Sequence, residues 1–293
     1  MNSSAQFAIG MVFFVVVTAE ARAQSPNVSA WDSVGRILQT PGSLAGGYYR
    51  YNLPRRDITL RIGDVTVSPS LALGAWAGFS GESGDATMMG DLVLTSPEVK
   101  PVQAELRRQR LDVTAVHNHL TGEMPAITYL HFHGQGEAID LARRLDHVIA
   151  LTGTPRPVSP PAARALGIDS ALVFKTLGRS GRAQGDVAQI SFVLVSDTVR
   201  VHGRPVTPAM AFGTPINIQM VTPSRAVATG DFAVTTGHAT PVVTALTDHG
   251  IIATAMHSHL IGESPTLYYI HFWADGPLPE VLAGLRAALD AAR

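Results

Sequence analysis

The chain has 293 residues, a formal net charge of −1 and only 15% charged side chains. This weak charge gives no electrostatic basis for binding nucleic acid or an anionic membrane surface. The chain contains no cysteine, which excludes disulfide bonds and thiolate metal sites, so any metal must be held by histidine and carboxylate. The length is sufficient for two modest domains.

An apolar run from Phe7 to Thr18 stands near the start of the chain. It is shorter than the roughly 20 residues that span a bilayer. Ala21-Arg22-Ala23 follows with the small-x-small pattern of a cleavage site, which predicts a signal peptide over residues 1–23 and an exported protein, periplasmic or secreted. No lysine or arginine precedes the run, so an uncleaved anchor is the alternative. After removal of this segment we expect no stable membrane span.

The segment that begins at His117 returns at His257. The residues that recur with this same spacing are His117, His119, Leu120, Gly122, Glu123, Pro125, Tyr129, His131 and Phe132. Further matches, with small changes in spacing, extend through the chain and predict two tandem repeat domains over residues 28–152 and 165–293. The proline-rich segment 153–164 between them is predicted to be a semi-rigid linker.

Each copy has the same order of predicted elements. In the first copy these are a helix at 32–39, strands at 57–62, 65–67 and 88–95, a helix at 96–108 capped by Ser96, strands at 111–120 and 127–133, and a last helix after Gly136. The glycine-rich segment 79–85 is predicted to be a loop that could line a site, and Arg55-Arg56 a solvated loop pair. The β-α-β-β-α order predicts an α+β fold of two homologous repeats. Each would be an antiparallel sheet with helices on one face, similar to a ferredoxin-like half, and the two would pack as a pseudo-two-fold pair.

Strand alternation decides which histidines can meet. In the strand 111–120 one face carries Val113, Ala115, His117 and His119, and in the return strand one face carries Ile127, Tyr129, His131 and His133. With the turn centred near Glu123, His117 lies opposite Tyr129 and His131 lies opposite Ala115. A slip of one residue would send the two sets of histidines to opposite faces, so convergence depends on this register.

In that register each copy presents three histidines that suit a divalent transition metal, with zinc as the first choice and copper as the alternative. The predicted metal ligands are His117, His119 and His131 in the first copy and His257, His259 and His271 in the second. Glu123 and Glu263 are the predicted catalytic bases of a metal-dependent, hydrolase-type enzyme. Asp91 or Asp231 could orient a histidine ring. His133 is set aside because Trp273 replaces it in the second copy.

Other interpretations remain open. The glutamates could be ligands in a metal-binding or small-ligand-binding protein without turnover, or the site could be polar and metal-free. The histidines could also be structural in an interaction protein, since duplication copies structural residues as faithfully as functional ones. The expected partner is an unidentified small molecule or a metal ion, and no residue pattern points to a particular substrate.

Several blocks of this chain match a known family. They are Leu53-Pro-Arg-Arg-Asp57, Trp76 with Phe79-Ser-Gly81, Gly90-Asp-Leu-Val-Leu94, Glu98-Val-Lys-Pro-Val102, Val116-His-Asn-His119, Glu123-x-Pro125 and Tyr129-Leu-His-Phe132. On these blocks the chain resembles the LppY/LpqO family of exported bacterial proteins, whose domain has no assigned reaction. The resemblance implies export and a double domain. Some members are lipoproteins, but this chain lacks the cysteine that carries the lipid and is expected to be free.

Overall fold

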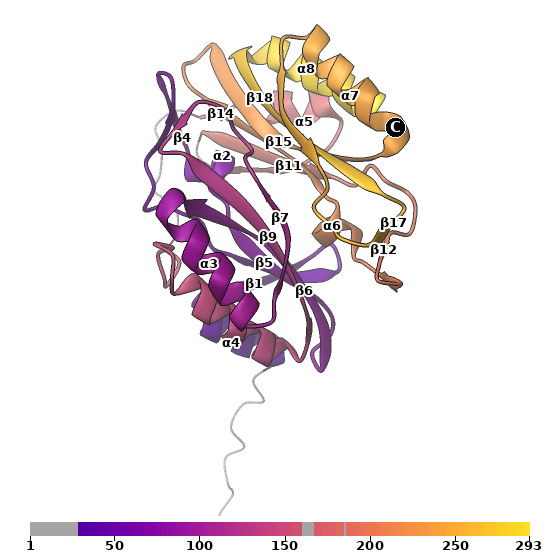
Figure 1. Cartoon of the computed structure of the whole chain (residues 1–293). Helices are drawn as coiled ribbons and strands as arrows, with labels where there is room; N and C mark the ends of the chain where they lie inside the picture. The colour runs from indigo at the N-terminus through magenta and orange to yellow at the C-terminus, as the bar shows by residue number, and fades with distance from the viewer. Residues whose placement is uncertain (1–28, 160–166, 185) are drawn as a thin grey trace, which may run out of the picture.

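The computed structural model describes residues 29–159, 167–184 and 186–293. The predicted signal peptide, 1–23, and residues 160–164 of the predicted linker lie outside these ranges. The described chain forms two tandem domains, each with a six-stranded antiparallel sheet and helices, as the α+β prediction requires (Figure 1). Within the described ranges, no helix combines the length and the hydrophobicity that crossing a membrane would need.

The elements of the first domain are α1 (Ala30–Leu38), β1 (Gly42–Ala45), β2 (Tyr48–Asn52), β3 (Leu60–Ile62), β4 (Val65–Val67), α2 (Pro69–Ala72), β5 (Trp76–Glu82), β6 (Asp85–Thr95), α3 (Ser96–Arg108), β7 (Asp112–His117), β8 (Glu123–Met124), β9 (Ile127–Gly136) and α4 (Ala138–Ile149). Those of the second are α5 (Ser170–Leu177), β10 (Arg182–Gln184), β11 (Val187–Phe192), β12 (Arg200–Val201), β13 (Arg204–Pro205), α6 (Pro208–Ala211), β14 (Thr214–Met220), β15 (Arg225–Thr235), α7 (Thr236–Asp248), β16 (Ile252–His257), β17 (Glu263–Ser264), β18 (Leu267–Pro277) and α8 (Leu278–Ala291).

The two sheets have the same strand order, β1-β2-β5-β6-β9-β7 and β10-β11-β14-β15-β18-β16. In the first, β6 and β7 are joined through α3, and β9 lies between them and is antiparallel to both. This is the split arrangement of a ferredoxin-like unit, and α4 completes the predicted β-α-β-β-α order. Strands β1, β2 and β5 extend the sheet beyond the strands predicted from the sequence.

The segment 79–85 is a β-hairpin, and its prediction as a loop is wrong. Phe79 lies in β5 opposite Met88 in β6, and the pairing continues to Glu82 and Asp85. The strand was not predicted because its glycines interrupt the alternation of apolar and polar residues. Gly78 is required there, since a Cβ at this position would lie 2.8 Å from the ring of Trp76 and 2.9 Å from that of Tyr48.

The N-terminus of α3 is fixed by a capping box one residue earlier than predicted. Thr95, not Ser96, is the N-cap, and Glu98 returns a hydrogen bond by accepting from the Thr95 backbone N–H at 2.7 Å. Ser96 is instead the first helical residue.

Arg55 is buried, with 1% of its surface exposed, which corrects its prediction as a solvated residue. Its guanidinium donates to both carboxylate oxygens of Asp57 and of Glu98, at 2.8–3.0 Å. Glu98 also accepts from the Gly153 backbone N–H at 2.6 Å. The network therefore attaches the end of the first domain to the start of α3.

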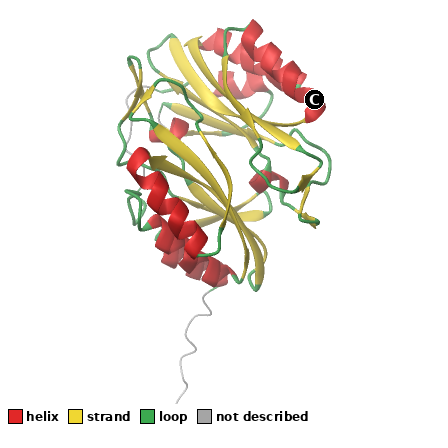
Figure 2. Cartoon of the chain, in the orientation of Figure 1, coloured by secondary structure: helices red, strands yellow, loops and turns green. Residues whose placement is uncertain are grey.

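The open faces of the two sheets face each other, and the long helices cover their outer faces (Figure 2). The short helix α2 of the first domain lies on the second sheet, where Asn217 Nδ2 donates to the Leu71 carbonyl and Gln219 Nε2 to the Thr66 carbonyl, both at 2.9 Å. In return α6 lies against the turn between β1 and β2 of the first domain, since a Cβ on Gly46 would be 2.6 Å from the Cβ of Ala209. A shared apolar cluster joins Tyr48 and Met89 of one domain to residues of the other that include Met210, Phe212 and Tyr269.

Candidate metal centre

The histidine hairpins have the register on which the predicted convergence depends. In the first domain β7 and β9 pair Ala115 with His131 and His117 with Tyr129. In the second, β16 and β18 pair Ala255 with His271 and His257 with Tyr269. The small alanine opposite each third histidine leaves room for its ring. This register is confirmed in both copies.

A β-bulge at Thr114 changes one face assignment. Val113 pairs with Phe132 and Ala115 with the adjacent residue His131, so Val113 and Ala115 point to opposite faces. Val113 packs against the core beneath the helices, and its predicted place on the histidine face is wrong. The bulge recurs at Thr254, whose hydroxyl donates to the His119 carbonyl of the other domain at 2.6 Å. The bulge therefore also fixes one hairpin against the other.

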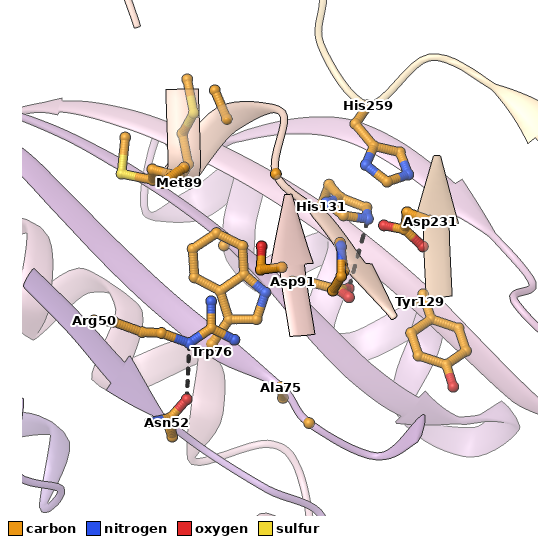
Figure 3. Close-up of a pocket in the computed structure, with 18 of the residues that line it drawn as sticks. Arg50, Asn52, Ala75, Trp76, Met89, Asp91, Tyr129, His131, Asp231 and His259 are labelled. Atoms are coloured by element: carbon orange, nitrogen blue, oxygen red, sulfur yellow. Dashed lines mark hydrogen bonds and ion pairs between the residues drawn. The ribbon is translucent and has the colours of Figure 1, made fainter. Parts of the chain in front are cut away.

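The six predicted histidines form one cluster, not a separate site in each copy as the sequence suggested. Ring centroids from different domains lie 3.8 Å apart for His117 and His257, and 3.9 Å apart for His119 and His271 and for His131 and His259. The two hairpins thus meet at the pseudo-two-fold axis between the sheets. His131 and His259 appear beside Asp91 and Asp231 in Figure 3.

The histidine Nε2 atoms face one another at distances that suit shared coordination. His119 Nε2 lies 2.9 Å from His117 Nε2, while His271 Nε2 lies 3.2 Å from His259 Nε2 and 3.3 Å from His257 Nε2. Two nitrogens bound to one zinc are about 3.3 Å apart at a tetrahedral angle and about 2.9 Å apart at a right angle. The ligand atoms of His117, His257, His259 and His271 all lie within 4.8 Å of one another, as do those of His117, His119 and His131.

Burial keeps these imidazoles in the form that binds metal. Burial lowers the pKa of His119, His131 and His259 well below the usual value, and the neighbouring imidazoles lower it further. Burial also lowers the pKa of His257 to about 4, with His271 adding to the shift. A neutral imidazole has a free lone pair, so no proton competes with the ion near neutral pH.

Two aspartates stand behind the histidines. Asp231 contacts His271 Nδ1, on the side of the ring away from the nitrogens of His257 and His259, as expected of a carboxylate that orients a metal-binding histidine. Asp91 Oδ1 lies 3.8 Å from His131 Nε2. Burial, together with the charge of Asp231, raises the pKa of Asp91 well above its usual range. A cation bound here would offset the mutual repulsion of the two carboxylates, so the arrangement suits a bound cation.

Some buried polar atoms of the cluster have no hydrogen-bond partner. They are His117 Nδ1, His131 Nε2 and Asp91 Oδ1. Buried polar groups are almost always paired, so orphaned atoms that gather at one place indicate a missing ligand. The donor set of nitrogen and carboxylate oxygen fits zinc or another divalent transition metal.

Glu123 and Glu263 lie in the loops of the hairpins. Glu123 is buried in β8 and accepts from the Ile127 backbone N–H at 3.4 Å. Glu263 accepts from the Ser258 hydroxyl at 2.9 Å and from the Leu267 backbone N–H at 3.5 Å. Among the described residues, neither belongs to a group of possible ligand atoms within 4.8 Å of one another. Their catalytic role stays a prediction, and the contacts show that both brace the loop.

A cavity of about 1130 Å³ lies between the sheets and reaches the cluster at His119, His131 and His259. Its lining from the first domain includes Arg50 and Trp76 (Figure 3). Sequence reasoning missed the cavity because its two walls come from different copies. Of these two residues, Trp76 had a signal through its place in the family blocks, and Arg50 had none. His133, set aside earlier, also lines the cavity, with Nδ1 at 3.9 Å from Asp112.

Comparison with known proteins gives a family and no reaction. None of the curated proteins matches the chain. Among solved structures the chain is similar to the crystal structure of EtuB from Clostridium kluyveri, with 14% identity over 87% of this chain and 90% of that one and a TM-score of 0.22, which is too weak to assign fold or function. A family model described as "Domain of Unknown Function (DUF1259)" matches residues 32–151 and again 171–291. The chain therefore belongs to this family and carries its domain in two tandem copies.

Proposed function

We propose that the protein binds a divalent transition-metal ion, zinc first, at the six-histidine cluster, and that the ion serves a hydrolase-type reaction on a small molecule in the adjoining cavity. The observation that carries this is the convergence of Nε2 atoms at 2.9–3.3 Å within each hairpin, in a cluster where ligand atoms of both domains lie within 4.8 Å of one another. Neutral side chains that merely pack have no reason to aim several lone pairs at one point. The set His117, His257, His259 and His271 offers four such ligands.

The cavity favours a reaction over storage of the ion. His119, His131 and His259 line it, so a molecule in the cavity would touch the ligand shell directly. A bound divalent ion supplies an activated water and polarises an oxygen of the substrate. Other residues of this chain position the histidines that would hold the ion: Asp231 orients the ring of His271, and Thr254 holds the backbone of His119. Glu123 and Glu263 remain the proposed bases, brought into play by movement of the hairpin loops.

The second candidate is a metal-binding protein without turnover. The observation that favours it is the number of histidines, because six imidazoles could fill every coordination position and exclude water. Cobalt(II) substitution separates the two candidates. An open position predicts that the visible spectrum changes when azide is added to the cobalt protein, whereas a closed shell predicts an unchanged spectrum.

The proposal also includes a cellular location. The likeness to LppY/LpqO proteins and the predicted signal peptide at 1–23 support an exported protein that would meet its metal and its ligand in the periplasm or outside the cell. The expected partners are the ion and a small molecule. The low net charge supports no role for nucleic acid.

Metal analysis tests the central claim. The chain is purified without a metal-affinity tag, loaded with zinc, desalted and measured by elemental analysis. We expect about one equivalent or more in the wild type and a large loss in the variant that combines His117→Ala and His257→Ala. His147→Ala is the matched control, because this exposed histidine of α4 lies outside the cluster. Binding of less than about 0.2 equivalents by the wild type would contradict the proposal.

A further inference from the structure

Two arginines from different domains line the same cavity. Arg50 comes from β2 of the first domain, and Arg182 from β10 of the second. In the first copy Arg50 of β2 pairs with Ser43 of β1, and in the second Arg182 of β10 pairs with Gln189 of β11. Each copy therefore has one arginine in this pair of strands, on the second strand in the first copy and on the first strand in the second copy. The two copies have therefore diverged at this wall of the cavity, where each contributes one positive charge.

Neutral groups hold Arg50 in place. Its guanidinium carbon lies 4.3 Å above the ring of Trp76, and its Nε donates to Asn52 Oδ1 at 2.9 Å (Figure 3). One further nitrogen donates to the Tyr48 hydroxyl at 3.2 Å. These contacts fix the orientation of the group without an ion pair, and its positive charge acts on Asp91 from a distance, where it lowers the pKa of that carboxyl against the larger effect of burial. Several of its five N–H donors are unused.

Arg182 is held in the same way. Its Nε donates to Gln189 Oε1 at 2.9 Å, and Gln189 in turn donates to the Ser70 carbonyl of the first domain at 2.7 Å. Arg182 is exposed on this wall of the cavity, yet partial burial lowers its pKa and the positive charge of Arg50 lowers it further, so the two guanidinium groups lie close enough to repel.

Neither arginine forms an ion pair within the described residues. In contrast, carboxylates pair with Arg55, Arg108, Arg144, Arg156, Arg204, Arg225 and Arg286. Two oriented guanidinium groups of like charge on the wall of one cavity attract an anion, and their planar donor forks match a carboxylate or a phosphoryl group.

The first sheet connects the strand of Arg50 to the metal centre. Asn52 pairs with Trp76, Trp76 with Asp91, and Asp91 with His131, which forms one row across four adjacent strands. Three strand spacings make about 14 Å between the backbones of β2 and β9. The side chains of Arg50 and His131 extend into the space above this row, so a small molecule can reach both.

We propose that Arg50 and Arg182 form the binding site for the anionic group, carboxylate or phosphoryl, of a small organic ligand whose other end reaches the histidine cluster. The second half of this statement rests on the proposed metal function, while the first half stands without it. Trp76 and Met89 line the space between and would contact the body of the ligand.

The test measures anion binding to chelator-treated, metal-free protein by calorimetry. Inorganic phosphate and succinate are the probes, and they distinguish a phosphoryl site from a carboxylate site. We expect at least one to bind, with affinity reduced about tenfold or more by Arg50→Met and by Arg182→Met. Arg36→Met, in the exposed last turn of α1, should bind as the wild type does. Thermal melts check that each variant is folded.

Two results would overturn the inference: no binding of either anion at millimolar concentration, or equal binding by wild type and both variants. The variant combining His117→Ala and His257→Ala is run beside them. If it binds the anion normally but no zinc, the two sites are separable. If the wild type binds the anion but takes up no metal, the proposed function fails and the anion site stands.

Discussion

The imidazole rings of His119 and His271 lie 3.9 Å apart, although one belongs to the first domain and the other to the second. The reciprocal pair, His131 and His259, has the same separation. For each of the six histidines, the nearest histidine ring therefore belongs to the other copy. The functional unit is the pair of domains, and this leads to distinct predictions.

Loss of one histidine should affect the whole centre. His271→Ala removes a nitrogen that lies close to those of both His257 and His259. In a shared centre, we expect it to lower the zinc affinity of all the metal that the chain binds, as measured by competition with a chromophoric chelator. His131→Ala should act similarly. Two independent sites would behave differently, since each variant would then keep one full equivalent at the wild-type affinity.

Asp231→Asn should weaken metal binding without unfolding the chain. The carboxylate contacts His271 Nδ1, and an amide in its place cannot stabilise the same ring orientation as strongly. Partners of this kind typically contribute about 10-fold to 100-fold in affinity. The measurement is the zinc dissociation constant, with the melting temperature of the metal-free protein as control. An unchanged dissociation constant would remove Asp231 from the centre.

Glu123→Gln separates three roles of this residue. A bracing role predicts a small loss of thermal stability and little change in zinc affinity, because the amide oxygen can still accept from the Ile127 N–H. A ligand role predicts a clear loss of affinity. A base role predicts normal zinc content and a lower rate once a substrate is known. Glu263→Gln, which should weaken the contact with Ser258, is the companion variant in the second domain.

Arg55→Met should destabilise the first domain. It removes the guanidinium from a buried network and leaves Glu98 and Asp57 without their partner. Breaking a buried ion pair from one side costs about 3 kcal/mol in the free energy of unfolding. Urea denaturation measures the change, and Arg36→Met serves as an exposed control. A loss below about 0.5 kcal/mol would show that the network contributes little.

The contribution of Glu98 to the free energy of unfolding should decrease at low pH. Burial raises its pKa, but hydrogen bonds from Arg55, Thr95 and Gly153 outweigh burial, and the pKa in the folded protein is lowered from 4.5. The folded state therefore binds this proton less readily than the unfolded state. Stability from Glu98 is complete above pH 4.5 and is lost as the pH falls through its folded pKa.

Unfolding of the wild type and of Glu98→Gln should be compared between about pH 7 and about pH 3. The difference in their free energies of unfolding is expected to shrink below pH 4.5, where the unfolded carboxyl takes up its proton. A difference that stays constant, or grows, across this range would be incompatible with the lowered pKa.

Much of each hairpin could be predicted from the sequence. With the turn assumed to be centred near Glu123, the alternation in β7 and β9 led to the register that the structure has, and the alanines at 115 and 255 supported it. The bulge at Thr114 was not predictable, because one extra residue in a strand leaves no mark in composition. Arg55 was misplaced because its partner Glu98 is distant in sequence, and burial of a charge can be recognised only with its partners in view.

The contact between the two hairpins could not be predicted from the sequence, for a different reason. Periodicity reports which face of a strand a side chain occupies, but it carries no information on how two sheets dock. Docking depends on contacts such as those of Asn217 with the backbone of α2 and of Gln219 with the backbone of β4, and neither side chain has a pattern that marks it for this role. The cavity and its two arginines follow from the docking and were missed with it.

The axis between the domains has one more consequence. If two identical chains built the same centre, each side chain on one wall of the cavity would have an identical counterpart on the other wall. The two ends of the cavity would then offer an elongated ligand the same contacts. Joining the copies in one chain removes that restriction. His133 stands where the second copy has Trp273, and Arg50 where it has Gln189, so the space beside a nearly symmetric set of histidines is itself asymmetric. We expect an elongated ligand to prefer one orientation in it.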